Sequence, residues 1–516
     1  MKRRSSTSSS PSSSTSISSS FSCNEDRISN LPDPLIHHIL SFMYTKYAVQ
    51  TCVLSKRWRY IWTSLPVLNF CEWVHYRETG VLERIREEPQ TTKRFIKFVT
   101  KVLSRRDDSD IQRFRLQSSL KYLTTDILYR CINRCITIAV SHNVQELYIQ
   151  VTPDWCFEVP PCLCTCESLT KLRLDLCAIG EDLTYGQITL PSIMSLPRLK
   201  SLHLQLEYLL FTDERLTNKF FSCFPTLESL VIKFLASDQI EFCGSTEFVF
   251  GGMNLKISLP ALKHFRFSST EDDMEGLEEE SNNEVTLNAP SLSSFILDSY
   301  MSTSFTLENL SSLVNADIEI NIHGRDKGYF DSGEDKKELY ARHFLRFFRG
   351  IHKVKILTLR HSFIMALGGA PEILDGQQLE FYNLQRLELW TYLSRDCLHS
   401  IFYVLKISPN IESVYLKISQ DEPQVDPYFG EPQLYPNCDE VKFNTENIGD
   451  YWEAGFSLPC MICHLKFVKI KEHLKISLSC ANFEKGASRW IWDWKLPGRD
   501  SKLLKGGLFA PETSWL

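Results

Sequence analysis

The sequence has no run of about 18 apolar residues, the length that a helix needs to cross a membrane. It also opens without the apolar segment of a secretory signal, since residues 1–22 are mostly serine and threonine. Its 17 cysteines are spread along 516 residues, unlike the short-spaced framework of a small secreted scaffold. We therefore expect a protein of the nucleus or cytoplasm with reduced thiols and no membrane partner.

An excess of positive charge is missing too. The chain carries 57 basic and 63 acidic residues, a net charge of -6 at pH 7. Because proteins that hold nucleic acid over a broad surface are basic, we expect no nucleic-acid partner. The sequence also lacks a P-loop, a dinucleotide-binding fingerprint, a GxSxG elbow and an HExxH motif. We predict a protein that is not an enzyme and has no cofactor.

Two cysteine-containing stretches have some features of haem or metal motifs. Cys460 to His464 has the CxxCH spacing of c-type haem attachment, but it lies at the start of an expected strand in a chain without an export signal. Cys162, Cys164 and Cys166 project to one face of an extended strand, which leaves the fourth ligand of a zinc site undefined. Structural thiols are favoured in both places, and we predict no metal site.

The most informative stretch is Asp26 to Phe70. Pro32 and Pro34 disfavour helix before them, so Asp33 is the expected N-cap of a helix that begins at Pro34. Its apolar residues recur on one broad face. Thr45 and Ser55 are the expected caps of a second and a third short helix. Three short helices cannot bury this many apolar side chains alone, which indicates an interface with a partner.

The two runs DRISNLPDPLIHHILSF and AVQTCVLSKRWRYIW, from Asp26 and Ala48, closely resemble the F-box of plant F-box/leucine-rich-repeat proteins, many of which carry a C-terminal FBD segment. The resemblance implies docking on an SKP1-type adaptor and, through it, on a cullin. Tyr44 stands where the family usually has proline and Tyr47 where it often has a polar residue, so a remodelled loop is expected there. By position, the implied adaptor contacts are Leu31, Pro32, Leu35, Ile36, Ile39, Leu40, Val53, Leu54 and Trp58.

Residues 91–106 form the next expected helix. Phe95, Phe98, Val99, Val102 and Leu103 share one face of it, and basic residues occupy the opposite face. Such a helix can lie on a membrane or bind nucleic acid. Its place between a helical unit and a repeat array favours a cap over the open end of a solenoid instead.

Twelve units after this helix repeat an apolar residue, a second one three positions on and a third two further on. The spacing of units from Leu169 to Leu313 brackets the period of leucine-rich repeats. Pro197, Pro225, Pro260, Pro290 and Pro409 each lie two residues before a unit, which fits the start of a strand. We predict a parallel strand in each unit. The units begin at Ile111, Val144, Leu169, Leu199, Leu227, Leu262, Leu292, Leu313, Val354, Leu384, Ile411 and Leu465.

The fold class is therefore α/β, with a three-helix F-box followed by an irregular leucine-rich-repeat solenoid that has a parallel sheet. The acidic segment Glu271 to Glu284 is expected to be an exposed loop, and Tyr451 to Ile470 resembles the opening of an FBD segment. The remaining tail has no clear helical or strand period. The predicted units are a disordered serine-rich tail (1–25), the F-box (26–70), a helical linker and cap (71–110), leucine-rich repeats (111–444), a partial FBD-like segment (445–480) and a divergent tail (481–516).

The resemblance implies a substrate-recognition adaptor of an SKP1–cullin–F-box ubiquitin ligase. The solenoid would hold an unknown protein substrate, and the chain would contribute proximity rather than chemistry. Two alternatives stay open: a protein-interaction scaffold without degradation, and a small-molecule receptor. The expected substrate contacts face the concave side of the sheet and are Arg173, Asp175, His203, Gln205, Arg360, Glu388, Trp390, Tyr415 and Lys417.

Overall fold

A computed structural model of the protein describes fifteen stretches of the chain. They are residues 30–73, 89–118, 125–151, 157–176, 188–189, 194–206, 214–234, 254–269, 283–300, 303–321, 344–368, 379–391, 395–419, 464–473 and 489–495. The predicted tail 1–25, the first twelve residues of the acidic segment and the CxxC cysteines Cys460 and Cys463 lie outside them. No helix in these stretches is both long and apolar enough to span a bilayer.

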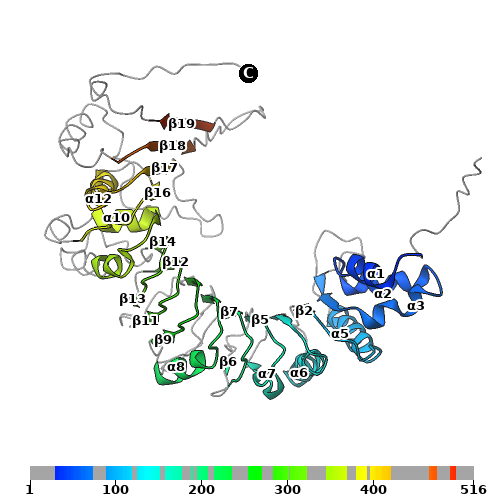
Figure 1. Ribbon diagram of the computed structural model, residues 1–516. Helices are drawn as coiled ribbons and strands as arrows, with labels where there is room; N and C mark the ends of the chain where they lie inside the picture. Colours follow the sequence, from blue (N-terminus) through cyan, green and yellow to red (C-terminus); the bar gives the residue numbers. More distant parts are fainter. Residues whose placement is uncertain are drawn as a thin grey trace, which may run out of the picture.

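The first described stretch is a helical unit at one end of the molecule (Figure 1). It contains α1 (Asp33–Leu40), α2 (Thr45–Gln50) and α3 (Trp58–Ile61), with short 3₁₀ turns at Thr51–Val53 and Trp62–Ser64. Three helices were expected here, but the caps differ. Pro32 is the N-cap of α1 and Asp33 its first residue, while Thr45 is the first residue of α2. Ser55 does accept the backbone N–H of Trp58 at 3.4 Å.

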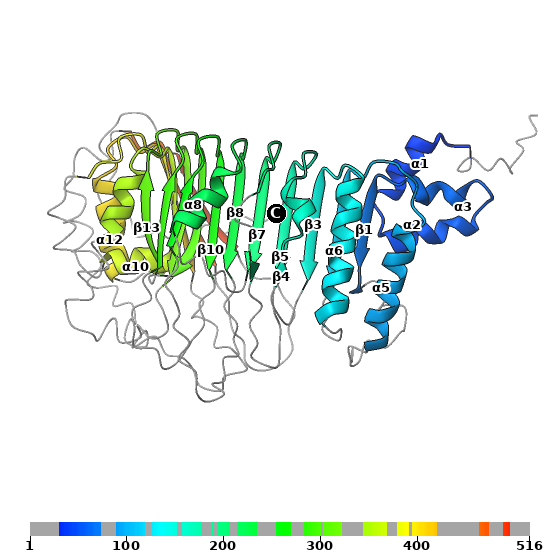
Figure 2. The same cartoon turned by 90° about the horizontal axis from the view of Figure 1, so that it is seen from below.

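A curved sheet dominates the rest of the molecule (Figures 1 and 2). Every unit predicted from the apolar repeat supplies one of its parallel strands, in chain order, which confirms the α/β solenoid. Within the described residues its 14 strands are, in spatial order, β1 (Val67–Cys71), β2 (Arg113–Ser118), β3 (Glu146–Val151), β5 (Lys171–Leu176), β7 (Ser201–Leu206), β8 (Ser229–Phe234), β10 (His264–Ser269), β12 (Ser294–Tyr300), β14 (Asn315–Asn321), β15 (Ile356–Leu359), β16 (Arg386–Thr391), β17 (Ser413–Ser419), β18 (Phe467–His473) and β19 (Arg489–Lys495).

The repeated apolar residues point into the core because side chains alternate along a strand. In β3, for example, Leu147 and Ile149 are buried, while Glu146 and Tyr148 face the other side. Equivalent residues stack from strand to strand, as in the parallel rings of Phe265 and Phe295, whose centroids are 5.7 Å apart. Each unit therefore buries its apolar residues against its neighbours, as expected for a solenoid.

The prolines before the strands occupy turns rather than extended segments. At Pro197 the N–H of Leu199 donates to the C=O of Leu196 at 3.1 Å, so proline is the second residue of a β-turn. The same bond follows Pro225, Pro260, Pro290 and Pro409. Proline suits this position because its fixed φ matches that of the turn. The expectation of a strand start was right, and the expected extended geometry was wrong.

Helices and two small sheets lie on the outer side of the curve (Figure 1). The three-stranded sheet has order β13-β11-β9 and is parallel, while β4 pairs with β6. Residues 344–351 are also helical. The other elements are α5 (Pro89–Leu103), α6 (Thr125–Ser141), α7 (Pro161–Cys164), α8 (Glu214–Ser222), α10 (His361–Gly368), α12 (Arg395–Lys406), β4 (Phe157–Glu158), β6 (Ile188–Thr189), β9 (Asn254–Ser258), β11 (Asn283–Asn288) and β13 (Thr303–Glu308). The last two residues of the acidic segment thus start β11 instead of a loop.

The sheet begins inside the helical unit, because β1 pairs with β2 in parallel. A boundary at residue 70 therefore cuts through a strand. Helix α5 lies between β1 and β2 in the chain and beside α6, so it is the outer helix of the first repeat rather than an end cap (Figure 2). Phe95, Val99, Val102 and Leu103 are buried as predicted, and Phe98 is partly buried.

The far end of the sheet also differs from expectation. Residues Arg489–Lys495, in the tail without a clear period, form β19 and pair antiparallel with β18. Antiparallel pairing needs no crossover helix, which allows the chain to reverse and cover the edge of the last parallel strand. The FBD-like segment contributes β18; its opening from Tyr451 lies outside the described residues.

Candidate functional site

The surface of the helical unit exposes large apolar side chains. Leu35, Ile39 and Phe42 lie at i, i+4 and i+7 along α1 and the turn after it, so they share one face. Val53 and Leu54 follow α2. All five side chains are between 47% and 83% exposed. Residues of this type are normally buried, so their exposure marks a candidate interface.

The structure corrects three of the nine implied adaptor contacts. Ile36, Leu40 and Trp58 are at most 4% exposed and belong to the core of the helical unit. Ile36 and Leu40 lie one turn apart on the face of α1 that is turned toward the unit's own interior. They position the outward face but do not form it. Leu31 is partly buried, whereas Pro32, Leu35, Ile39, Val53 and Leu54 are exposed.

Arg57 holds the two parts of this surface together. Its guanidinium donates to the C=O of Leu31 and to Asp33 Oδ1, each at 2.5 Å. These bonds join the segment before α3 to the start of α1. Both charged groups are solvent-exposed, so the ion pair itself contributes no more than about 1 kcal/mol. Its main effect is to fix the position of Leu31 and the start of α1 relative to α3.

The two residues that depart from the family pattern lie in a compact turn. Tyr44 has φ -63°, close to the value that proline imposes, so tyrosine reproduces the backbone of the usual residue. Tyr47 is partly buried in α2, and the ammonium of Lys46 lies 6.0 Å from the centre of its ring. The turn keeps its backbone bonds from Phe42 to Ile39 and from Met43 to Leu40.

The concave face of the sheet is the second candidate surface. Alternate residues of each strand point to it, and strand pairing aligns them in rows across the sheet. Arg173 and His203, for example, are paired across β5 and β7, and Glu388 and Tyr415 across β16 and β17. All nine predicted substrate contacts occupy such positions: Arg173, Asp175, His203, Gln205, Arg360, Glu388, Trp390, Tyr415 and Lys417.

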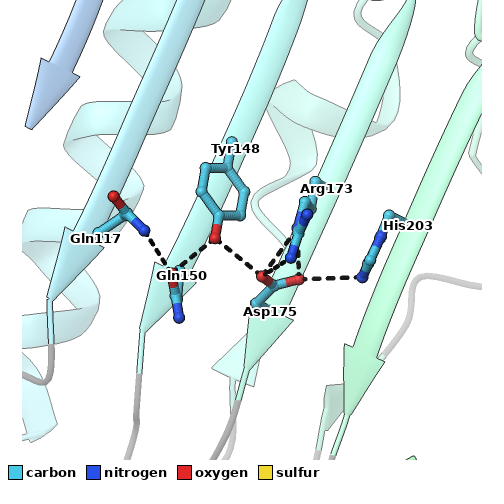
Figure 3. A network of polar contacts seen from close by, with 6 residues as sticks. All are labelled: Gln117, Tyr148, Gln150, Arg173, Asp175 and His203. Carbon is cyan, nitrogen blue, oxygen red and sulfur yellow. Dashed lines mark hydrogen bonds and ion pairs between the residues drawn. The ribbon is translucent and has the colours of Figure 1, made fainter. Parts of the chain in front are cut away.

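A polar network fills the concave face between β2 and β7 (Figure 3). Its centre is Asp175, whose two oxygens accept Arg173 Nε at 3.0 and 2.9 Å. The hydroxyl of Tyr148 lies 3.0 Å from Asp175, and His203 Nε2 lies 3.5 Å away. Because these groups cover it, the Asp175 side chain is only 1% exposed. Asp175 is therefore not available to a substrate, which corrects its predicted role.

His203 is held neutral in this network. Burial lowers its pKa most, and the positive charges of Arg173, Lys233 and Arg266 lower it further, to about 4. The carboxylate of Asp175 opposes these effects but does not overcome them. Three neighbouring cations thus act on the His203 ring against one carboxylate.

A second polar cluster lies between β12 and β17. Arg360 contacts Asp317 at 3.2 Å and Glu319 at 3.3 Å. It also packs 4.3 Å from the ring centre of Trp390, and Lys417 lies 3.9 Å from the same centre. Arg360 directly follows β15 and Lys417 lies on β17, so the two cations flank the tryptophan on β16. Their cation–π contacts hold the ring on the concave face.

The carboxyl group of Glu319 is harder to ionise than that of an ordinary glutamate. Burial raises its pKa, and the nearby Asp298 and Asp317 raise it further, to about 7, although Arg360 opposes them. One guanidinium is shared between Asp317 and Glu319, so it cannot fully compensate both. Next to this cluster, Arg386 binds Glu388 at 2.5 Å and stacks 4.1 Å from the ring centre of Tyr415.

Comparison with known proteins agrees with this arrangement. The F-box domain family matches residues 28–70. An F-box/FBD/LRR-repeat protein of Arabidopsis thaliana is 31% identical over 400 residues, which is 75% of this chain and 76% of the relative. The chain belongs to the F-box/FBD/LRR-repeat family. A putative F-box/FBD/LRR-repeat protein of the same plant is 25% identical over 86% of this chain and 83% of its own length, and F-box/LRR-repeat protein 13 is 28% identical over 76% of each.

Several residues of this F-box/FBD/LRR-repeat protein were missed from the sequence. Phe42 extends the exposed F-box face, and Tyr148, Gln150 and Gln117 complete the concave network. The signal was available, because each concave residue occupies the same outward position in its strand as a predicted contact. Their mutual contacts could not be predicted, because they depend on which strands are neighbours.

The three clustered cysteines are not on a strand. Cys162 and Cys164 lie in helix α7, and Cys166 follows it. Cys164 and Cys166 are buried, and Cys162 lies 3.5 Å from the hydroxyl of Thr137. In the described part of this F-box protein, no three histidine, cysteine or acidic side chains are grouped to hold a metal ion.

Proposed function

We propose that this chain is the substrate-recognition adaptor of an SKP1–cullin–F-box ubiquitin ligase. Its F-box would dock on an SKP1-like protein, and through it on a cullin, in the nucleus or cytoplasm. Its concave sheet would hold a target protein for ubiquitination. The chain itself would supply no catalytic group.

The exposure of Leu35, Ile39, Phe42, Val53 and Leu54 carries the proposal. Full burial of one such side chain is worth about 1.5 to 3 kcal/mol, so a partner that covers several of them gains considerable free energy. Exposed groups of this kind on a small helical unit are typical of protein–protein interfaces. The F-box resemblance supports an SKP1-like protein as that partner.

The solenoid supports the second half of the proposal. Its core residues point away from the concave face, so the face can vary without loss of the fold. After the correction of Asp175, the proposed target contacts are Arg173, His203, Gln205, Arg360, Glu388, Trp390, Tyr415 and Lys417. A target held there would be close to the conjugating enzyme, and this raises the effective concentration of its lysines near the thioester.

Co-purification with an SKP1-like protein tests the docking step. The double variant Leu35→Asp/Ile39→Asp places charges in the exposed face of α1 without removing core side chains. We expect it to lose the complex while it keeps the unfolding temperature of the parent. Val314→Asp, at an exposed apolar residue of the solenoid, is the matched control and should keep the complex.

Two outcomes would count against this role. Absence of a complex with the unchanged chain, or equal loss with Val314→Asp, contradicts specific docking through the F-box. Trp58→Ala is unsuitable for the test, because Trp58 is buried and its loss would disrupt the F-box itself. Deletion of the F-box is unsuitable as well, since it removes β1 from the sheet. The docking variant is the better background in which to identify proteins that accumulate as targets.

A further inference from the structure

Charge is distributed unevenly over the concave face. Between β2 and β10 the outward positions carry six cations and two carboxylates, a net charge of +4 in a chain whose total is -6. The next two strands of the main sheet, β12 and β14, carry Asp298, Asp317 and Glu319 instead. The positive region of the concave face therefore ends at β12. Its charged residues are Arg113, Arg115, Lys171, Arg173, Lys233 and Arg266, with Glu146 and Asp175.

Both carboxylates are already occupied. Glu146 accepts Arg113 at 2.6 Å and Lys171 at 2.7 Å, and Asp175 is held by Arg173 as described above. Three cations of this face have no carboxylate partner among the described residues, namely Arg115, Lys233 and Arg266. Arg115 packs 4.5 Å from the ring centre of Tyr148, and its buried Nε has no hydrogen-bond acceptor in the described structure.

Strand pairing places Lys233 and Arg266 near His203, since Val231 is paired with both His203 and Arg266, and Lys233 with Gln205. Lys233 and Arg266 both lower the pKa of His203, although they lie on β8 and β10 and His203 lies on β7. Their fields therefore overlap above the centre of the face. Val231 and Tyr148 lie in the same row of outward positions as His203, so the positive region also contains apolar surface.

The spread of the cations limits the shape of a ligand. Arg115 and Arg266 are separated by five strand spacings, or about 24 Å at about 4.8 Å each. An extended polypeptide of about seven residues covers this distance. A single phosphate is too small to reach all three cations. A long polyanion such as nucleic acid would meet the carboxylates of β12 and β14.

We infer that the concave face from β2 to β10 binds a short, extended, carboxylate-rich segment of the target protein. This inference rests on the proposed adaptor function and names the chemistry that its target surface recognises. Carboxylates spaced along the segment would pair with Arg266 and Lys233 at one end and with Arg115 at the other. Charge-assisted bonds of this kind are among the stronger polar contacts of an interface.

Binding of a labelled peptide to the full chain tests the inference. The probe is a fluorescein-labelled eight-residue peptide of alternating glutamate and serine, and its partner is the same peptide with glutamine. Two further probes are a peptide with one phosphoserine and no glutamate, and an eight-nucleotide single-stranded DNA. We expect fluorescence anisotropy to report binding of the glutamate peptide that weakens with salt and is lost with glutamine.

Matched charge variants locate the site. Lys233→Gln/Arg266→Gln should weaken binding of the glutamate peptide by at least about ten-fold. The control Lys200→Gln/Lys263→Gln removes the same charge from two exposed lysines that pair with Glu228 and lie one residue before β7 and β10. It should change the affinity by less than about two-fold. Equal weakening by both variants, equal binding of the glutamine peptide, or tighter binding of the phosphopeptide or the DNA would overturn the inference.

Measuring complex formation with the SKP1-like protein alongside peptide binding distinguishes failure of this inference from failure of the proposed function. The variant Lys233→Gln/Arg266→Gln should still form the complex with the SKP1-like protein. The variant Leu35→Asp/Ile39→Asp should still bind the glutamate peptide. Peptide binding without any SKP1-like complex would contradict the adaptor function and leave the acidic-segment site standing. A complex without peptide binding would contradict only the inference. An unchanged unfolding temperature in both charge variants ensures that lost binding is not lost folding.

Discussion

The hydroxyl oxygen of Thr45, on F-box helix α2, accepts the backbone N–H of Asn69 on strand β1 at 2.7 Å. Asn69 lies on β1, which is the edge strand of the described sheet and pairs with β2. Its N–H would otherwise be an open edge group. A side chain of the F-box thus completes the hydrogen bonding of the solenoid, so the two parts of the protein form one folded unit at this junction.

Thr45→Val should destabilise this junction. Thr45 is only 1% exposed. Valine keeps the shape of threonine but leaves the Asn69 N–H without its acceptor. The expected loss of unfolding free energy is about 1 to 3 kcal/mol. Urea unfolding followed by circular dichroism measures it. Thr226→Val, at an exposed threonine that donates to the C=O of Pro197, should change stability by less than about 0.5 kcal/mol. Equal effects of the two variants would contradict a special role of Thr45.

Glu319 should make stability depend on pH. Because the folded state raises its pKa from 4.5 to about 7, the folded protein binds this proton more tightly than the unfolded chain. Its contribution to stability is full below pH 4.5 and is lost as the pH rises through about 7, with a total of at most about 3 kcal/mol.

Glu319→Gln should therefore be more stable relative to the parent at pH 8 than at pH 5. Urea unfolding of both proteins at the two pH values gives the comparison. Glu308→Gln, which removes an exposed carboxylate of β13, is the control. The same pH-dependent gain in this control would show that general charge, not the site of Glu319, causes the effect.

His203 should remain neutral far below its ordinary range. Its pKa is lowered to about 4 by burial and by Arg173, Lys233 and Arg266, so its contribution to stability is full above pH 6.5 and is lost as the pH falls through about 4. NMR titration of the ring protons, assigned with His203→Gln, should show no midpoint above pH 5. A midpoint near 6.5 would contradict the combined effect of burial and of these three cations.

Gly350 should not tolerate alanine. Its position is helical, where alanine would normally gain about 1 kcal/mol. A methyl group there would lie 2.7 Å from Leu307 Cβ, which cannot move without β13. Overpacking costs about 1 to 3 kcal/mol, so the steric effect should win and lower the unfolding temperature of Gly350→Ala. A raised unfolding temperature would show that the helix has room to shift.

The strands and the turns show how much can be predicted locally. The spacing of Leu199, Leu202 and Leu204 predicts a strand because alternate side chains must enter one core. Pro197 marks its start correctly, yet the turn itself has a closing hydrogen bond that the residue type alone does not specify. Local periodicity therefore locates strands better than it describes the backbone between them.

The candidate sites show the corresponding limit. The apolar pattern of the F-box identifies Leu35 and Ile39 together with Ile36 and Leu40, but it does not say which pair faces outward. That choice depends on the packing of α1 against residues such as Trp58, more than fifteen positions away. Asp175 was predicted to be a contact from its place in β5, and Arg173, Tyr148 and His203 then bury it.

The sequence by itself determined the α/β solenoid, the order of its twelve repeat strands and the F-box, because each depends on short-range spacing of apolar residues. Only the tertiary structure decided that β1 of the F-box starts the sheet and that β19 runs antiparallel at its end. It also decided that the cations without a carboxylate partner among the described residues gather between β2 and β10. These features depend on which distant segments become neighbours. Charge compensation and burial are properties of those neighbours, not of any one stretch of sequence.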